Sequence, residues 1–80
     1  MLPGLSSHPG APPDEELWRL VKGRRVAVCW QRRHSLGFEV RLDVNGDTLR
    51  TTLERTVEAA REQSAYMRDA MTGKGWTQPA

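Results

Sequence analysis

The segment FEVRLDVNGDTLRTTLE, residues 38–54, decides the fold. Apolar side chains alternate with charged ones from Phe38 to Val44, which is typical of a strand that buries one face. Asn45 and Gly46 follow at once and favour a type I′ turn, because both central positions of that turn need a positive φ. A second strand over residues 48–54 should therefore run antiparallel to the first. Its inward residues would be Leu49, Thr51 and Leu53.

The segments before this hairpin indicate another one. Residues 17–22 (LWRLVK) end at Gly23, and residues 25–33 (RVAVCWQRR) are rich in the β-branched and aromatic residues that favour strands. Residues 34–37 (HSLG) should form the turn that leads into Phe38. The four strands would then follow one another in a meander.

A helix is expected after the last strand. Thr56 can cap a helix from Val57 to about Thr72, and Gly73 is placed to end it in a left-handed conformation. The buried stripe, at spacings of three and four, would be Val57, Ala60, Ser64, Met67, Ala70 and Met71. The sequence therefore predicts an α+β fold, a four-stranded antiparallel β-meander covered on one face by a single C-terminal α-helix (ββββα).

Eighty residues suffice for one domain. Residues 1–16 are expected to form a disordered N-terminal tail, because the first 13 hold four of the five prolines and little that could form a core. The domain would span residues 17–76, with residues 77–80 as a C-terminal tail and Trp76 packed back on the helix end or the sheet. A core this small could be supported by homodimerisation through an open sheet face or an edge strand.

Cysteine usage and hydropathy bear on the compartment. A single cysteine, Cys29, allows no intramolecular disulfide, which favours a reducing cytoplasm. The chain has no apolar run of the roughly 18 residues that a membrane span needs, and its start lacks the pattern of a signal peptide. No membrane partner is expected.

Catalysis and cofactor binding are disfavoured by the residues present. The histidines are His8 in the tail and His34 in a turn, and Cys29 lies in an apolar strand where cysteine is usually a core residue. One cysteine and two histidines do not supply a structural zinc site. The Gly73-Lys74-Gly75 run lacks the other residues of a phosphate-binding loop. The chain is thus expected to be no enzyme and to bind neither cofactor nor metal.

Basic residues are concentrated in the first hairpin. Residues 17–33 hold six basic side chains and no acid, although the net charge of the whole chain is only +2. If Cys29 faces the helix, Trp30 lies on the opposite face together with Arg32, Arg41 and Arg50. An aromatic side chain among arginines is typical of interface hot spots. The alternative is that Trp30 points into the core and Cys29 outward. The candidate partner-binding residues are Arg24, Arg25, Trp30, Arg32, Arg33, Arg41 and Arg50.

These features predict a non-enzymatic module that binds another macromolecule through protein–protein contact. The alternative is a nucleic-acid-binding module, because aromatic side chains on a sheet stack bases and arginines hold phosphates. Acidic residues such as Glu39 and Asp43 on the neighbouring strand place this alternative second.

Residues 16–76 resemble a group of small bacterial proteins of unknown function with the pattern LWRL…C…HPLGWELRL…DGELLRS…KGW. The matching segments here are LWRL, HSLGFEVRL, VNGDTLR and KGW, with Ser35 in place of the proline and Phe38 in place of the tryptophan. That resemblance implies the ββββα fold and no activity. In size and arginine content the chain also resembles phage and mobile-element inhibitors of bacterial defence complexes, including anti-CRISPR proteins, which implies action by covering a surface of a larger complex.

Overall fold

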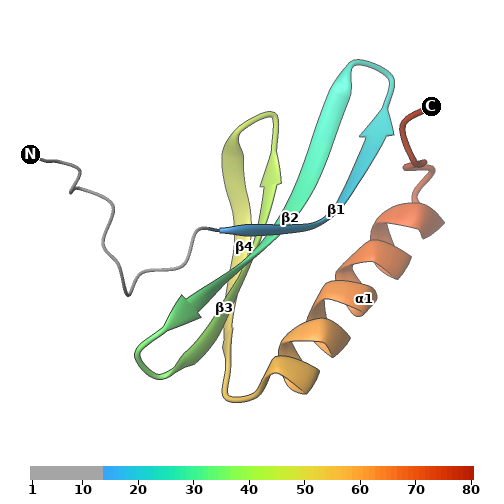
Figure 1. The fold of residues 1–80 in the computed structure, drawn as a ribbon. Coiled ribbons are helices and arrows are strands. Elements are labelled where there is room, and N and C mark those ends of the chain that lie inside the picture. The colour runs from blue at the N-terminus through green and yellow to red at the C-terminus, as the bar shows by residue number, and fades with distance from the viewer. Residues whose placement is uncertain (1–13) are drawn as a thin grey trace, which may run out of the picture.

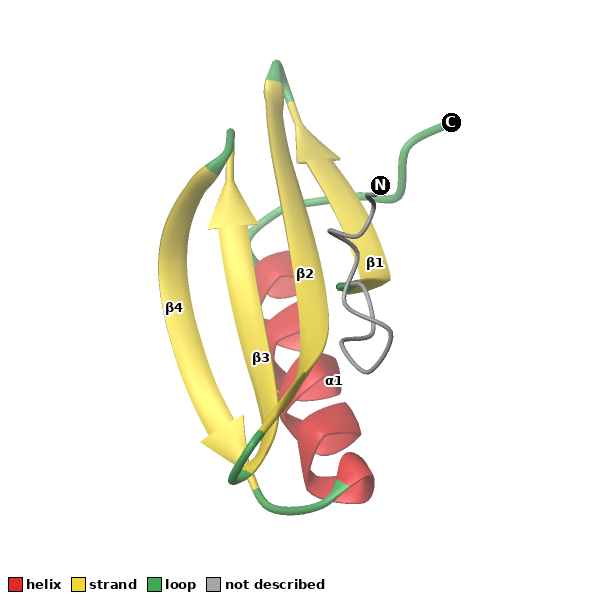
Figure 2. Cartoon of the chain, turned by 60° about the vertical axis from the view of Figure 1, so that its left-hand side comes forward, coloured by secondary structure: helices red, strands yellow, loops and turns green. Residues whose placement is uncertain are grey.

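The computed structural model describes residues 14–80, which form one antiparallel sheet and one helix (Figure 1). The ββββα fold predicted from the sequence is confirmed, and the four strands lie in the sheet in chain order. The helix lies against one face of the sheet only (Figure 2). The elements are β1 (Glu15–Lys22), β2 (Arg25–His34), β3 (Gly37–Val44), β4 (Asp47–Glu54) and α1 (Val57–Gly73).

Both ends of the domain differ from the expected boundaries. Strand β1 begins at Glu15, so Glu15 and Glu16 belong to the sheet and not to the expected N-terminal tail. Residues 1–13 of that expected tail lie outside the described part of the chain. Thr77, expected in the C-terminal tail, pairs with the edge of β1: the Val21 N–H donates to the Thr77 carbonyl at 2.7 Å, and the Thr77 N–H donates to the Val21 carbonyl at 2.9 Å. The domain therefore extends by two residues at the N-terminal end and includes Thr77.

The register of the strands determines which side chains meet the helix. Trp18, Cys29 and Leu42 lie opposite one another across β1, β2 and β3, and directly paired residues of antiparallel strands share a face. The strict alternation of β3 buries Val40 and Leu42, as predicted. The buried core consists of Leu20, Ala27, Cys29, Val40, Leu42, Ala60, Met67, Met71 and Trp76.

The prediction for the inward residues of β4 is wrong, and a β-bulge is the reason. Asp43 pairs with Thr48, but Leu42 pairs with Arg50, so Leu49 is an extra residue in β4. One extra residue reverses the facing of every later position. The row toward the helix is therefore Arg50, Thr52 and Glu54, while the side chains of Leu49 and Leu53 are 66% and 46% exposed.

Two of the three tight turns of the meander have structural reasons for their residues. Asn45 (φ 52°) and Gly46 (φ 85°) form the predicted turn. The Asn45 side-chain oxygen also accepts the Val26 N–H at 3.0 Å, which ties this turn to β2. In the other turn, Gly37 has φ 147°, and a Cβ at this position would collide with the carbonyl oxygen of Glu54. Only glycine therefore suits position 37.

Helix α1 begins as predicted and ends differently. The Thr56 hydroxyl accepts the Ala59 N–H at 3.1 Å, which confirms the N-cap. Ala60, Ser64, Met67 and Met71 of the predicted stripe are buried, but Ala70 is exposed. Gly73 remains helical, and Gly75, at φ 97°, is the residue that turns the chain back. That turn brings Trp76, which is 5% exposed, into the core.

The close approach of Gly37 to β4 yields a stability prediction. Gly37→Ala should lower the free energy of unfolding by about 2 kcal/mol or more, because a Cβ adds both backbone strain and a collision with Glu54. Gly73→Ala is the matched control, since the helical Gly73 has open space around it and the change should raise stability by up to about 1 kcal/mol. Urea unfolding followed by circular dichroism measures both, and equal effects of the two changes would contradict the role of Gly37.

Candidate functional site

The first candidate site is the outer face, which we define as the sheet face that points away from α1. Trp30 lies there, directly opposite Arg41 of β3 and Glu16 of β1. Its side chain is half-buried. Val28 lies on the same face and is only 9% exposed, although no element of the described chain covers it. Long neighbouring side chains therefore shield part of this face.

Carboxylates pair with the arginines of the outer face. Arg41 lies 3.4 Å from Asp14 and 3.2 Å from Asp43. Arg32 lies 3.1 Å from Glu39 and 4.0 Å from Asp14. Asp14, just before β1, thus links the two arginines that flank Trp30.

A third arginine of the same face is also paired with a carboxylate. The Arg19 guanidinium lies 2.9 Å from Glu16, and this hydrogen bond lowers the pKa of the Glu16 carboxyl. Arg19 and Glu16 are both exposed, so the pair contributes little to stability. The outer face therefore carries an aromatic side chain within a set of neutralised charges.

The structure brings together only some of the candidate residues. Trp30, Arg32 and Arg41 share the outer face. Arg50, expected beside them, lies on the helix side because of the bulge, opposite Leu42. The remaining three are dispersed: Arg24 is in the β1–β2 turn, Arg25 lies over the Trp76 ring at 5.0 Å, and Arg33 lies over the Phe38 ring at 5.8 Å.

The position of Cys29 decides between the two predicted orientations of Trp30. Cys29 is 0% exposed and faces α1, so Trp30 faces outward. Burial raises the pKa of the Cys29 thiol, while a hydrogen bond with Ser64 opposes that shift. A thiol that stays protonated inside the core is a poor nucleophile.

His34 forms a hydrogen bond within its own turn and does not lie near the other candidate catalytic side chain, Cys29. His34 Nδ1 accepts the Leu36 N–H at 3.1 Å, so the imidazole stabilises its own turn. His34 is exposed at the end of β2, five residues along the strand from the buried Cys29. Within residues 14–80, no three His, Cys, Asp or Glu side chains gather in a way that could hold a metal ion. The same residues include no helix that is long and apolar enough to cross a membrane.

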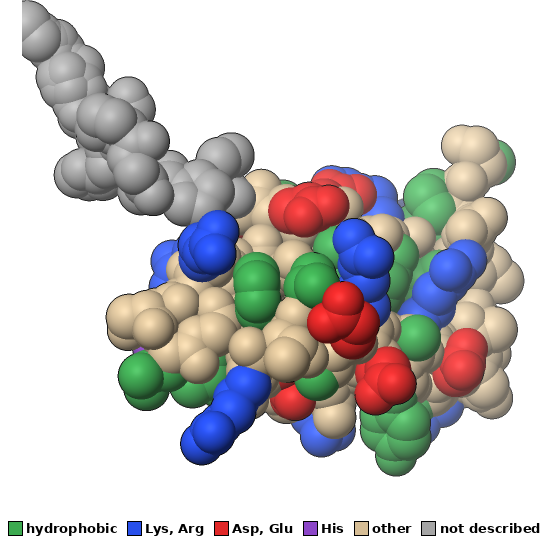
Figure 3. Space-filling model, turned by 60° about the horizontal axis from the view of Figure 1, so that its bottom comes forward, with side chains coloured by type: hydrophobic (Ala, Val, Ile, Leu, Met, Phe, Trp, Pro, Cys, Tyr) green, Lys and Arg blue, Asp and Glu red, His purple; other side chains and the backbone are tan. Residues whose placement is uncertain are grey.

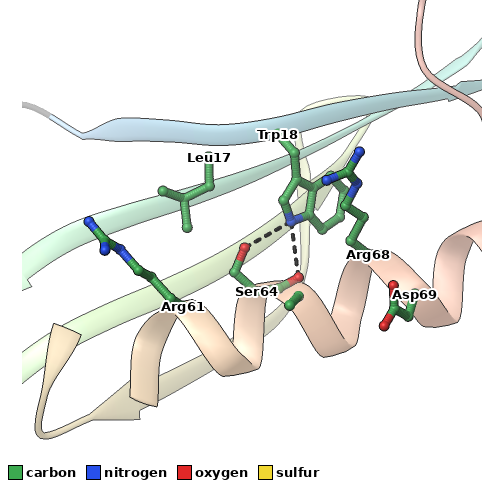
Figure 4. A pocket seen from close by; sticks show the side chains of 7 residues that line it. Leu17, Trp18, Arg61, Ser64, Arg68 and Asp69 are labelled. Atoms are coloured by element: carbon green, nitrogen blue, oxygen red, sulfur yellow. Dashed lines mark hydrogen bonds between the residues drawn. The ribbon is translucent and has the colours of Figure 1, made fainter. Parts of the chain in front are cut away.

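A pocket between β1 and α1, of about 320 Å³, was not predicted from the sequence (Figure 4). The Trp18 indole N–H donates to the Ser64 carbonyl at 3.0 Å and to the Ser64 hydroxyl at 2.9 Å. Arg61 and Arg68 of α1 lie on either side of Ser64 (Figure 4). Their spacing of seven residues puts both arginines on one helix flank, which is the sequence pattern that could have indicated the pocket.

A second groove, of about 250 Å³, lies between β4 and α1. Leu49 and Tyr66 line it and are 66% and 64% exposed. Arg50 and Lys74 supply positive charge at the same groove. Sequence reasoning missed it because Leu49 was expected to be buried.

No protein-family model, curated protein or solved structure matches the chain. The function therefore has to be inferred from the chain's own geometry, and the outer face around Trp30 is the feature that carries it.

The buried thiol gives a prediction about reactivity. In the folded protein Cys29 should react with iodoacetamide at least about tenfold more slowly than in urea, because burial both blocks access and suppresses the thiolate. Mass spectrometry of timed samples measures the rates. The control is Cys29→Ala combined with Ser35→Cys, which moves the thiol to an exposed turn and should remove the difference. Fast alkylation of native Cys29 would show that the thiol is accessible.

Proposed function

We propose that the chain is a non-enzymatic protein-binding module whose partner contacts the outer face around Trp30. The observation that carries the proposal is a half-buried tryptophan on a sheet face that no described element covers, flanked by Arg32 and Arg41. Tryptophan and arginine are the residues most enriched at the energetic centres of protein interfaces. The rigid sheet holds the indole in place, so little side-chain entropy is lost on binding.

The charge pattern of the outer face favours a protein partner. The three arginines Arg19, Arg32 and Arg41 are paired with the carboxylates of residues 14, 16, 39 and 43, so the set sums to a charge of −1. Acidic and basic side chains are also interspersed on the face shown in Figure 3. Exposed ion pairs are worth only about 0–1 kcal/mol each. A partner protein with both acidic and basic side chains can therefore replace these intramolecular ion pairs with intermolecular ones at a small cost in free energy.

Nucleic acid is the second candidate, and the same ion pairs make it weaker. A phosphate near Trp30 would have to compete with Asp14, Glu39 and Asp43 for the arginines. The basic side chains of Arg24, Arg33 and Arg50 do not share the outer face with Trp30. A base stacked on Trp30 would therefore lack free arginines around it.

A more specific form of the proposal is that the bound protein belongs to a bacterial defence complex, which the chain inhibits by covering one of its surfaces. The small size and the absence of an exposed catalytic thiol in residues 14–80 agree with action by binding. The corresponding test is activity of the captured complex as purified chain is added. Inhibition that saturates at a fixed molar ratio supports this form, and full activity at saturation contradicts it.

Trp30→Ala should abolish capture of the partner and leave the domain folded. The native chain and the variant are each immobilised and exposed to host extract. Mass spectrometry identifies the proteins that each one retains. Binding of each identified protein, in purified form, to the native chain and to the variant is then measured. Tyr66→Ala removes an exposed aromatic residue from the helix and should leave capture unchanged.

Trp76→Ala should lower the free energy of unfolding by about 3–5 kcal/mol, and Trp30→Ala by much less. Unfolding by Trp30→Ala, or undiminished capture, would refute the proposed interface.

For nucleic acid we expect no salt-sensitive binding. Gel shifts with single- and double-stranded DNA and RNA at low and at physiological salt test this, because binding through free arginines weakens steeply as salt rises. Strong binding at low salt that is lost when Arg24 and Arg33 are changed to glutamine would reverse the order of the two candidates.

A further inference from the structure

The two edges of the sheet differ in how they are covered. The β1 edge is partly occupied, because Thr77 forms two backbone hydrogen bonds with Val21. Among residues 14–80, strand β4 has only β3 as a neighbour, and Figure 2 shows no described element along its outer side. An uncovered edge strand offers unpaired N–H and C=O groups to another strand.

The turn geometry identifies the backbone groups that β4 offers. The two-residue turn between β3 and β4 makes Val44 direct its N–H and C=O toward β4, and Val40, four residues earlier, does the same. Thr52 lies opposite Val40 and therefore bonds to β3. Its two neighbours in the strand direct their backbone groups to the open edge, and these are Thr51 and Leu53.

The side chains along this edge have unused bonding capacity. Arg50, Thr52 and Glu54 form one row on the helix side of β4. None of the ion pairs within residues 14–80 involves Arg50 or Glu54. The Thr52 hydroxyl oxygen is buried and has no hydrogen-bond partner among the described residues, which is an unfavourable state for a polar atom.

We propose that a second copy of this chain pairs antiparallel with β4, with the two-fold axis at Thr52. Arg50 of each copy then lies opposite the partner's Glu54, so two ion pairs form on the helix side of the sheet. Thr51 lies opposite the partner's Leu53, and each such pair exchanges both backbone hydrogen bonds. The two Thr52 side chains lie opposite each other at the axis, where a rotation about χ1 would turn each buried hydroxyl toward the other.

Neighbouring registers form fewer favourable side-chain pairs between the two β4 strands. An axis at Arg50 would put two arginines opposite each other, which is destabilising. An axis at Thr51 would pair Leu49 with the partner's Leu53, but the bulge leaves Leu49 outside the regular alternation of β4. An axis at Leu53 would put Thr52 opposite the partner's Glu54 and form no pair between Arg50 and Glu54. Only the axis at Thr52 uses the two charges and the unpaired hydroxyl together.

This pairing is independent of the proposed function. A two-fold axis perpendicular to the sheet keeps the faces of the two copies together. The dimer would thus be one continuous sheet with both Trp30 side chains on one side and both α1 helices on the other. A dimeric partner could then be bound through two sites at once.

Sedimentation velocity of the full chain over a concentration series gives the dimer Kd, and charge-reversal variants of Arg50 and Glu54 test the register. Arg50→Glu should raise the dimer Kd by about tenfold or more, because each changed side chain faces the partner's Glu54. Glu54→Arg should do the same, and the double variant Arg50→Glu/Glu54→Arg should restore the Kd of the native chain. Arg61→Glu combined with Glu58→Arg is the matched control, since these residues lie on α1, and should leave the Kd unchanged.

Leu53→Pro tests the backbone contact separately. It removes an N–H that faces the open edge and leaves the bonds of β4 to β3 intact, so the dimer should be lost while circular dichroism shows a folded monomer. A native chain that remains monomeric at high micromolar concentration overturns the proposal. A dimer whose Kd is unaffected by the single charge changes overturns it equally.

Discussion

One helix can cover only one face of a four-stranded sheet, and this constraint shapes the rest of the molecule. Helix α1 approaches β3 and β4 most closely, and small side chains are buried on the covered side, namely Ala27 and Cys29 on β2 and Ala60 and Ser64 on α1. Ser64 also accepts the indole N–H of Trp18, so a polar residue inside the contact is satisfied and fixes β1 relative to the helix. No helix or strand of residues 14–80 covers the opposite face.

The segment after the helix completes the covered side. Gly75 reverses the chain, Trp76 fills the core beneath Arg25, and Thr77 hydrogen-bonds with β1. These contacts join residues about 55 positions apart in the sequence, and the Lys22 ammonium adds a 2.6 Å hydrogen bond to the Lys74 carbonyl. The result is an asymmetric sheet whose β1 edge is partly occupied and whose β4 edge is open.

Charge on the outer face is arranged as pairs, which distinguishes it from a typical phosphate-binding surface. Asp14 connects Arg32 and Arg41, although it precedes the first strand and is distant from both in sequence. Two of the six basic residues between residues 17 and 33, Arg19 and Arg32, are thus paired with acids from β1, from just before it and from β3. A count of charges along one segment overstates the positive field that a ligand would meet.

The sequence by itself determined the elements, the buried face of β3 and most of the buried stripe of α1. The alternation of residues 38–44, the Asn45-Gly46 turn, the Thr56 cap and the helix stripe are local features whose periods reflect strand and helix geometry, so no distant contact was needed to read them. The orientation of Trp30 and the facing of β4 were decided only in the tertiary structure. Whether Cys29 or Trp30 points inward depends on which face α1 covers, and the sequence allowed both. The bulge at Leu49 arises from pairing with β3 and moves Arg50 to the helix side, because one unpaired residue reverses the facing of all later positions in a strand.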